Sequence, residues 1–226
     1  MSKITQDCHK YNLLDVSKYN DINLNKSPLF SGLVKSNKFT VDNYFLDVNE
    51  SSLSPESYKQ FYFTGIDPSL VRDDIPKTDQ TTKSRLKRLK KTNEFYAPEA
   101  DELNYTFNLG RDYGVFDEIF SFFSSKLLRI RLAAMKPNFS IKPHVDYDPS
   151  YVTRYHFPIQ TNDQSKMHVK RKQNGLDIIT STHFPADGGL YFLNTGREHW
   201  ASNDGENYRV HLIIDVHGQK ELEMVL

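Results

Sequence analysis

The sequence contains a single cysteine, Cys8, among its 226 residues. One cysteine cannot form a disulfide within the chain, and it cannot build a cysteine-based zinc site. There is also no stretch of about 18 apolar residues, the length that a membrane-spanning helix needs, and the first residues lack the apolar segment of a secretion signal. We therefore expect a cytoplasmic protein in a reducing compartment, with no membrane partner.

The chain has no excess of charge of either sign, because 29 Lys and Arg residues balance 29 Asp and Glu residues. A neutral chain has no general attraction for nucleic acid or for an anionic membrane. One local exception is the segment 83–91, in which six of nine residues are basic. We interpret it as a solvated helix face or loop, with the binding of phosphates or an acidic partner as the alternative.

Several common enzyme motifs are missing as well. The sequence has no Gly-x-x-x-x-Gly-Lys phosphate loop, no Gly-x-Gly-x-x-Gly after a strand, and no Gly-x-Ser-x-Gly elbow. These absences argue against nucleotide hydrolysis, dinucleotide binding of the Rossmann type and α/β-hydrolase chemistry.

The second half of the chain carries the pattern of short strands. Apolar and polar residues alternate from Leu128 to Ala134, and further runs rich in β-branched and aromatic residues follow, with turn signals such as Asn174-Gly175 and Asp204-Gly205 between them. Short strands at this spacing indicate an antiparallel sandwich, a jelly roll or a barrel.

The first half of the chain is different. Residues 1–102 are polar and weakly periodic, so we expect an irregular arm that covers a core domain at 103–226. Residues 114–126 place six aromatic and aliphatic side chains at largely helical spacing, which predicts an amphipathic helix packed on the outside of the domain.

Seven of the eight histidines lie between residues 144 and 217, inside the strand-rich half. His144 and Asp146 are two residues apart, so on an extended strand they point to the same side and can bind one metal ion. His199 follows a turn, and Arg209 lies on the next expected strand, where a guanidinium can hold a carboxylate through two hydrogen bonds. Two imidazoles and one carboxylate form the facial triad of non-haem Fe(II) enzymes, but the spacing alone leaves ordinary strand histidines equally open.

A family resemblance favours the metal site over ordinary strand histidines. The run RLAAMKPNFSIKPHVDYDPSYVTRYHFPIQTN, followed by GGLYFLNTGREHWASNDGENYRVHLIIDV, resembles the aspartyl/asparaginyl β-hydroxylase-like family of Fe(II)/2-oxoglutarate dioxygenases. The matching features are the His-x-Asp after Lys-Pro, the Arg-x-His-x-Pro-Ile strand, the His-x-Ala-x-Asn block and the Arg-Val-His-Leu strand. The animal members lack the acidic ligand, whereas this chain keeps Asp146 and so looks like the bacterial members with a complete triad.

The resemblance implies a double-stranded β-helix, or jelly roll, with the site inside it. It implies that His144, Asp146 and His199 bind Fe(II), and that Arg209 holds the distal carboxylate of the co-substrate 2-oxoglutarate. His156 would also touch 2-oxoglutarate and Arg154 would meet the substrate, although these two assignments can be exchanged. The reaction would use dioxygen to hydroxylate an unactivated C–H bond of an amino acid, free or in a peptide.

One further residue and two alternative functions complete the expectations. His211 faces the same way as Arg209 on the expected strand, and we interpret it as a packed residue behind the site rather than a direct contact. A cupin-type metal enzyme that does not use 2-oxoglutarate would have no need of Arg209. A non-catalytic jelly-roll binding module would bind no metal and would depend on segment 83–91.

Overall fold

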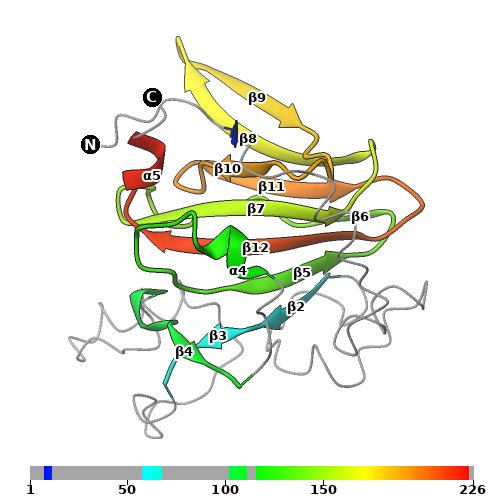
Figure 1. Ribbon diagram of the computed structural model, residues 1–226. Coiled ribbons are helices and arrows are strands. Elements are labelled where there is room, and N and C mark those ends of the chain that lie inside the picture. The colour runs from blue at the N-terminus through cyan, green and yellow to red at the C-terminus, as the bar shows by residue number, and fades with distance from the viewer. Residues whose placement is uncertain (1–7, 12–57, 68–101, 111–115, 224–226) are drawn as a thin grey trace, which may run out of the picture.

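Figure 1 shows the chain as a computed structural model, which describes residues 8–11, 58–67, 102–110 and 116–223. The basic segment 83–91 and most of the expected N-terminal arm lie outside these residues. No helix among the described residues is long and apolar enough to cross a membrane.

Two antiparallel β-sheets form the body of the molecule (Figure 1). The larger sheet has the strand order β1-β10-β7-β12-β5-β2, and its strands are Cys8–Tyr11, Leu190–Leu193, Val152–Gln160, Arg209–His217, Arg131–Met135 and Tyr58–Tyr62. The smaller sheet has the order β6-β11-β8-β9, with strands Phe139–Ser140, Glu198–Asn203, Ser165–Gln173 and Leu176–Thr182. A separate pair joins β3 (Thr64–Gly65) to β4 (Phe107–Asn108).

The order of strands β5 to β12 is that of a double-stranded β-helix. The chain alternates between the two sheets except at the β8–β9 hairpin, so that β10-β7-β12-β5 face β6-β11-β8-β9. Eight antiparallel strands in two facing sheets make a jelly roll. The fold class predicted from the sequence is therefore confirmed.

Strand β12 shows why the larger sheet has two different faces. Val210, Leu212 and Ile214 alternate with Arg209, His211 and Ile213, so the period of two makes one face fully apolar and gives the other its polar residues. The apolar face packs against aromatic residues outside the barrel, which include Phe63, Phe116 and Phe120. A second apolar cluster lies between the two sheets and contains Met135, Met167, Val169, Phe184, Tyr191, Leu193 and Ala201.

The helix predicted at 114–126 is wrong in its length. Helix α4 spans only Asp117–Phe120, and residues 114–115 lie outside the described part of the chain. The chain leaves the helix because Ser124 and Ser125 donate their backbone N–H groups to the buried carboxylate of Glu221, next to the short C-terminal helix α5 (Lys220–Glu223). The phenylalanines still pack on the core as expected, since burial needs their proximity and not a longer helix.

The described parts of the N-terminal half add to the larger sheet. β1 pairs with β10 at one edge, and β2 pairs with β5 at the other. A short 3-10 helix at Glu102–Asn104 precedes β4. The boundary near residue 102 stays a prediction, although β1 and β2, which precede it, pair with strands of the core domain.

Candidate active site

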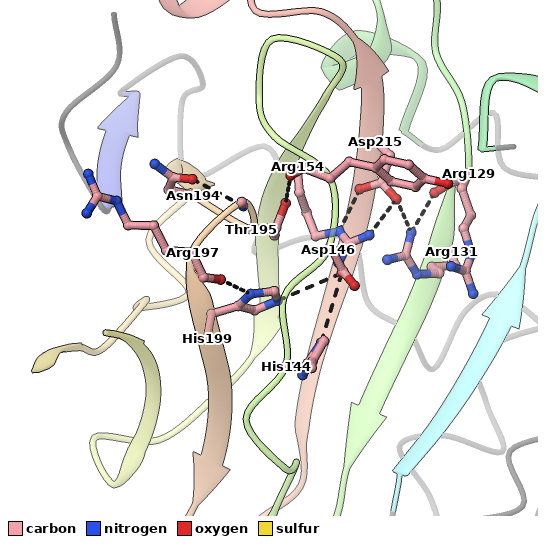
Figure 2. A network of polar contacts seen from close by, with 12 residues as sticks. Arg129, Arg131, His144, Asp146, Arg154, Asn194, Thr195, Arg197, His199 and Asp215 are labelled. Atoms are coloured by element: carbon pink, nitrogen blue, oxygen red, sulfur yellow. Dashed lines mark hydrogen bonds and ion pairs between the residues drawn. The ribbon is translucent and has the colours of Figure 1, made fainter. Parts of the chain in front are cut away.

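Three side chains from different parts of the jelly roll meet between its two sheets. The ligand atoms of His144, Asp146 and His199 all lie within 4.8 Å of one another. The Asp146 Oδ2 atom is 3.9 Å from Nε2 of His144 and 3.8 Å from Nε2 of His199. Figure 2 shows the three side chains pointing toward a common centre. The three residues that the sequence singled out as metal ligands are thus brought together.

The backbone fixes this arrangement locally. After β6 the chain stays extended, and His144 and His199 exchange two backbone hydrogen bonds of 3.0 and 2.8 Å. Asp146 then donates its N–H to the carbonyl of Thr195 at 2.9 Å. The segment around His144 is therefore held on β11 and on the turn before it, although it is not a regular strand.

Hydrogen bonds also set the orientation of both imidazoles. Nδ1 of His144 lies 2.8 Å from the carbonyl oxygen of Lys142, and Nδ1 of His199 lies 2.9 Å from that of Arg197. A carbonyl can only accept, so in each ring Nδ1 carries the proton and Nε2 presents its lone pair. Both lone pairs are on the atoms that face Asp146, which is the arrangement that metal ligation by histidine requires.

The local electrostatics keep Asp146 and His199 in the protonation states that metal binding needs. Burial lowers the pKa of His199 to about 4, against the opposing effect of Asp146, so the ring is neutral near pH 7. Burial alone would raise the pKa of Asp146, but Arg154, through its charge and its hydrogen bond, together with His199 and His144 outweighs burial and holds the pKa at about 2. His144 is 42% exposed, which leaves one side of the cluster open to an incoming molecule.

The donor set fits a non-haem Fe(II) centre. Two imidazoles and one carboxylate on one face of a metal leave positions for a co-substrate and dioxygen. The other nearby carboxylate, Asp148, is not part of the group, because its Oδ1 accepts hydrogen bonds from the backbone and hydroxyl of Ser150.

Arg154 links the metal-ligand candidates to a buried ion-pair network. Its Nη1 donates to Asp146 Oδ2 at 2.6 Å, while its Nε and Nη2 donate to the two oxygens of Asp215 at 2.7 and 3.1 Å. Arg131 donates from its Nη1 to Asp215 Oδ2 at 2.8 Å (Figure 2). The guanidinium predicted to meet substrate is therefore bound within the protein in this conformation, and its role toward substrate stays a prediction.

Arg209 and His156 lie in a second buried group on the same inner face. Arg209 is 3% exposed and His156 is 2% exposed. Two of their polar atoms, Arg209 Nη1 and His156 Nε2, are buried without a hydrogen-bond partner among the described residues. Burial lowers the pKa of Arg209 to about 10, so the side chain keeps its positive charge near pH 7. A buried cation with a partnerless donor suits an anionic ligand.

Sequence reasoning missed Asp215 and Arg131. Both face the inside of the jelly roll, and Asp215 is fully buried. On β12 the side chains of Arg209, His211 and Ile213 point to the inside of the jelly roll. Asp215 continues this period of two and therefore lies on the same face. The sequence did offer a signal, because Asp215 stands within the apolar run LIIDV. A carboxylate buried among such residues needs a positively charged partner.

Comparisons with known proteins identify the family of the chain. The sequence model described as aspartyl/asparaginyl beta-hydroxylase matches residues 75–218. No curated protein is similar enough to count as a match.

Among solved structures, a 2OG-Fe(II) oxygenase family oxidoreductase from Burkholderia pseudomallei is 14% identical, with a TM-score of 0.38 over 76% of this chain and 77% of that chain. A prolyl-4-hydroxylase from Pseudomonas putida is 9% identical, with a TM-score of 0.45 over 95% of this chain and 94% of that chain. At such TM-scores the family assignment depends on the sequence match and not on these structures.

Proposed function

Because the chain belongs to the aspartyl/asparaginyl β-hydroxylase family and is thus a 2-oxoglutarate-dependent hydroxylase, we propose that it hydroxylates an unactivated C–H bond of an amino acid, free or within a peptide. In this proposal His144, Asp146 and His199 hold Fe(II). The convergence of these three side chains inside the jelly roll carries the proposal.

Fe(II), when bound with 2-oxoglutarate and dioxygen, supplies the oxidation, in which the co-substrate leaves as succinate and CO2. The protein's own contribution is position and polarity. The two Nε2 lone pairs and the Asp146 carboxylate would hold the metal on one side, and the exposed edge of His144 leaves the other side accessible.

Arg209 and His156 are the proposed partners of 2-oxoglutarate. The observation that supports them is a pair of buried atoms, Arg209 Nη1 and His156 Nε2, that have no hydrogen-bond partner in the described part of the chain. A carboxylate of the co-substrate would satisfy such donors, and burial away from water makes a charge-assisted hydrogen bond stronger.

The balance of buried charge favours a substrate that carries a carboxylate. The inner face holds three buried arginines, Arg131, Arg154 and Arg209, whereas Asp146 and Asp215 supply two negative charges. Fe(II) and doubly charged 2-oxoglutarate cancel each other, so one positive charge remains. A buried charge without a counterion is unfavourable, and an amino acid's α-carboxylate or an acidic side chain would neutralise it. Arg154 is the residue that we propose to share between Asp146 and this carboxylate.

The test is substrate-stimulated conversion of 2-oxoglutarate to succinate by the Fe(II)-loaded enzyme, with three matched sets of compounds. These are free amino acids, the same amino acids as neutral amides, and peptides with or without one acidic residue. We expect stimulation by a free amino acid or by an acidic peptide, and none by the corresponding amide or neutral peptide. Equal stimulation by the acid and its amide would contradict the proposed substrate class.

A further inference from the structure

Strand β9 forms one edge of the smaller sheet. The strand order β6-β11-β8-β9 ends with it, and among the described residues it pairs only with β8. In Figure 1 the hairpin of β8 and β9 projects from the body of the jelly roll at the top of the view. The outer side of an edge strand presents backbone N–H and C=O groups to which another strand can bind.

The turn of this hairpin fixes the hydrogen-bonding pattern of β9. Asn174 and Gly175 join the two strands and have φ angles of 51° and 81°, as in a type I′ turn. Such a turn is closed by a hydrogen bond between its flanking residues, which here are the paired Gln173 and Leu176. From this closing pair onward, hydrogen-bonded and non-hydrogen-bonded pairs alternate along the two antiparallel strands.

This alternation assigns each backbone N–H group of β9 to one side of the strand. Ile178 and Thr180 direct their N–H groups toward β8, because they stand two and four positions beyond the closing pair in an unbroken register. Asp177, Ile179 and Ser181 therefore direct their N–H and C=O groups away from β8, to the edge of the sheet.

Strand β9 lacks the features that usually protect an edge strand. It contains no proline or lysine, and its seven pairs with β8 include no bulge. Its one charged residue, Asp177, forms an ion pair with Lys172 of β8 at 3.5 Å. Leu176 is 68% exposed and Ile179 is 54% exposed, and they are two of the four large apolar side chains exposed in the described part of the chain. A regular edge with exposed apolar residues is a surface on which another strand binds.

The charge of the hairpin indicates which kind of strand fits. From Ser165 to Thr182 it holds four basic residues and one acidic residue, and four minus one leaves a formal charge of +3. Three of the basic residues, Lys170, Arg171 and Lys172, lie at the end of β8 near the turn. The alternating N–H and C=O groups of an edge are matched by a polypeptide backbone, so the fitting ligand is an extended peptide segment with acidic side chains.

The register places this edge near the proposed metal site. Thr180 pairs with Val169, and Val169 pairs with His199, so the three residues form one row across the smaller sheet. A strand added beyond β9 would lie three strand spacings from β11, or roughly 14 Å. An extended chain covers this distance with about four residues. A peptide that continues from β9 by that length is therefore long enough to reach His199.

We propose that the edge of β9 binds an acidic segment of a polypeptide substrate as an added β-strand, at least about four residues away from the residue that is hydroxylated. The inference rests on the proposed function, and it selects a peptide over a free amino acid as the substrate. The outward N–H groups provide the affinity for a backbone, and the basic hairpin provides the preference for acidic side chains.

The probe for this surface is a set of peptides selected on the full-length protein loaded with Zn(II). They come from a displayed library of random sequences of about sixteen residues, enough for one strand and the connection to the metal site. We expect the selection to enrich acidic and β-branched residues. Failure to enrich any peptide, or a set without excess acidic residues, would overturn the inference.

Amide hydrogen exchange of the ¹⁵N-labelled protein, measured by NMR, locates the bound peptide. Without peptide, the amides of Ile178 and Thr180 should exchange slowly and those of Asp177, Ile179 and Ser181 rapidly. Saturating peptide should slow exchange in the second group by about tenfold or more and change the first group little. A bound peptide that leaves the second group unprotected would show that it binds elsewhere.

Two substitutions at one position separate a backbone contact from a side-chain contact. Ile179→Pro removes an N–H that faces the edge and keeps the hydrogen bonds to β8, so the Kd of the selected peptides should rise at least about tenfold. Ile179→Thr keeps this N–H and suits a strand, so it should change the Kd by less than about threefold. Equal Kd values for Ile179→Pro and the wild type would contradict the inference. If Ile179→Pro does not fold, as judged by circular dichroism, the exchange pattern of the wild type decides.

Two further outcomes have separate meanings. Light scattering that shows a dimer of the wild type, lost in Ile179→Pro, would mean that a second copy of the chain covers β9, which overturns the inference. Succinate formation stimulated by free amino acids but by none of the selected peptides would also overturn it and leave the proposed function standing. Peptides that bind β9 when no peptide or amino acid stimulates succinate formation would instead overturn the proposed function and leave β9 as a peptide-binding surface.

Discussion

Asp215 shows at the scale of one residue how the site is organised. Its carboxylate is fully buried between the guanidinium groups of Arg131 and Arg154. Burial favours its protonation, but the two positive charges outweigh burial and lower the pKa of Asp215 far below the usual value. Nη1 of Arg154 donates to Asp146, so a residue on β12 helps to orient a proposed metal ligand on a distant segment.

This network predicts a large effect for Asp215→Asn. The change removes the carboxylate charge that the buried guanidinium groups of Arg131 and Arg154 share, which costs about 3 kcal/mol of folding stability. The melting temperature should fall by roughly 6 to 12 °C in a chain of this size. Thermal unfolding followed by circular dichroism measures it.

Asp177→Asn is the control for that variant. Its ion pair with Lys172 spans 3.5 Å between exposed side chains, so its loss should change stability by less than about 1 kcal/mol. Equal melting temperatures for wild type and Asp215→Asn would show that the buried network contributes no stability.

At the scale of elements, the turn between β10 and β11 holds the segment that carries His144 and Asp146. Thr195 accepts the N–H of Asp146 through its carbonyl, and its hydroxyl donates to the carbonyl of Tyr147 at 3.3 Å. Next to it, Gly196 allows the two segments to approach closely. A Cβ atom there would lie 3.0 Å from the Cα of Asp148 and 3.2 Å from Cδ of Pro149.

Gly196→Ala should therefore weaken metal binding without a large loss of folding. The added methyl group pushes the backbone of Asp148, and the displacement reaches Asp146 two residues away. We expect metal affinity to fall roughly tenfold, as when groups that support metal ligands are disturbed. Titration with Co(II), followed by its visible spectrum, measures this affinity.

Gly175→Ala is the matched control. Gly175 has a φ of +81° at the tip of the β8–β9 hairpin, and no atom of the described residues lies within 4 Å of the added Cβ. The left-handed backbone makes alanine unfavourable by about 1 kcal/mol, so this variant should lose stability but bind Co(II) as the wild type does. Equal Co(II) affinity in Gly196→Ala and Gly175→Ala would contradict the role of the turn.

The sequence predicted elements well where a local period decides the structure. The spacing of two between His144 and Asp146 put both on one side of an extended segment, and the positions of His199 and Arg209 followed from turn signals. The helix at 114–126 was predicted too long, because its period cannot reveal that Glu221, about a hundred residues later, binds the backbone of Ser124 and Ser125. The partners of Asp215 were hidden for the same reason, since strand pairing brings β5, β7 and β12 together only in the fold.

At the scale of the whole molecule, the larger sheet separates two environments. Its outer face carries the main apolar core, and its inner face carries buried arginines, histidines and Asp215. The outer core and the cluster between the sheets thus provide the burial that keeps His156, His199 and His211 neutral.

These neutral histidines predict that acid destabilises the metal-free protein. In the unfolded chain each takes up a proton near pH 6.5, whereas burial lowers the folded-state pKa of His199 to about 4 and those of His156 and His211 well below 6.5. Below pH 6.5 the unfolded state binds more protons, so stability falls as pH falls, by up to about 1.4 kcal/mol per pH unit for each histidine.

Thermal melting of the metal-free protein at pH 8, 7, 6 and 5 measures this dependence. We expect little change from pH 8 to 7 and a steepening loss below 6.5. The slope should be shallower in His211→Asn, which removes one of the three groups. A melting temperature at pH 5 equal to that at pH 7 would mean that the folded protein binds these protons after all.

The most direct test of the account is anaerobic addition of Fe(II) and then 2-oxoglutarate to the metal-free protein, monitored by the visible charge-transfer band of chelated 2-oxoglutarate. We predict that the band forms in the wild type and in the control His217→Ala, and that it is lost in His199→Ala. Arg209→Ala should need about 100-fold more 2-oxoglutarate, because it removes charge-assisted hydrogen bonds. Bound iron without a band in the wild type, or an unchanged band in His199→Ala, would contradict the proposed site.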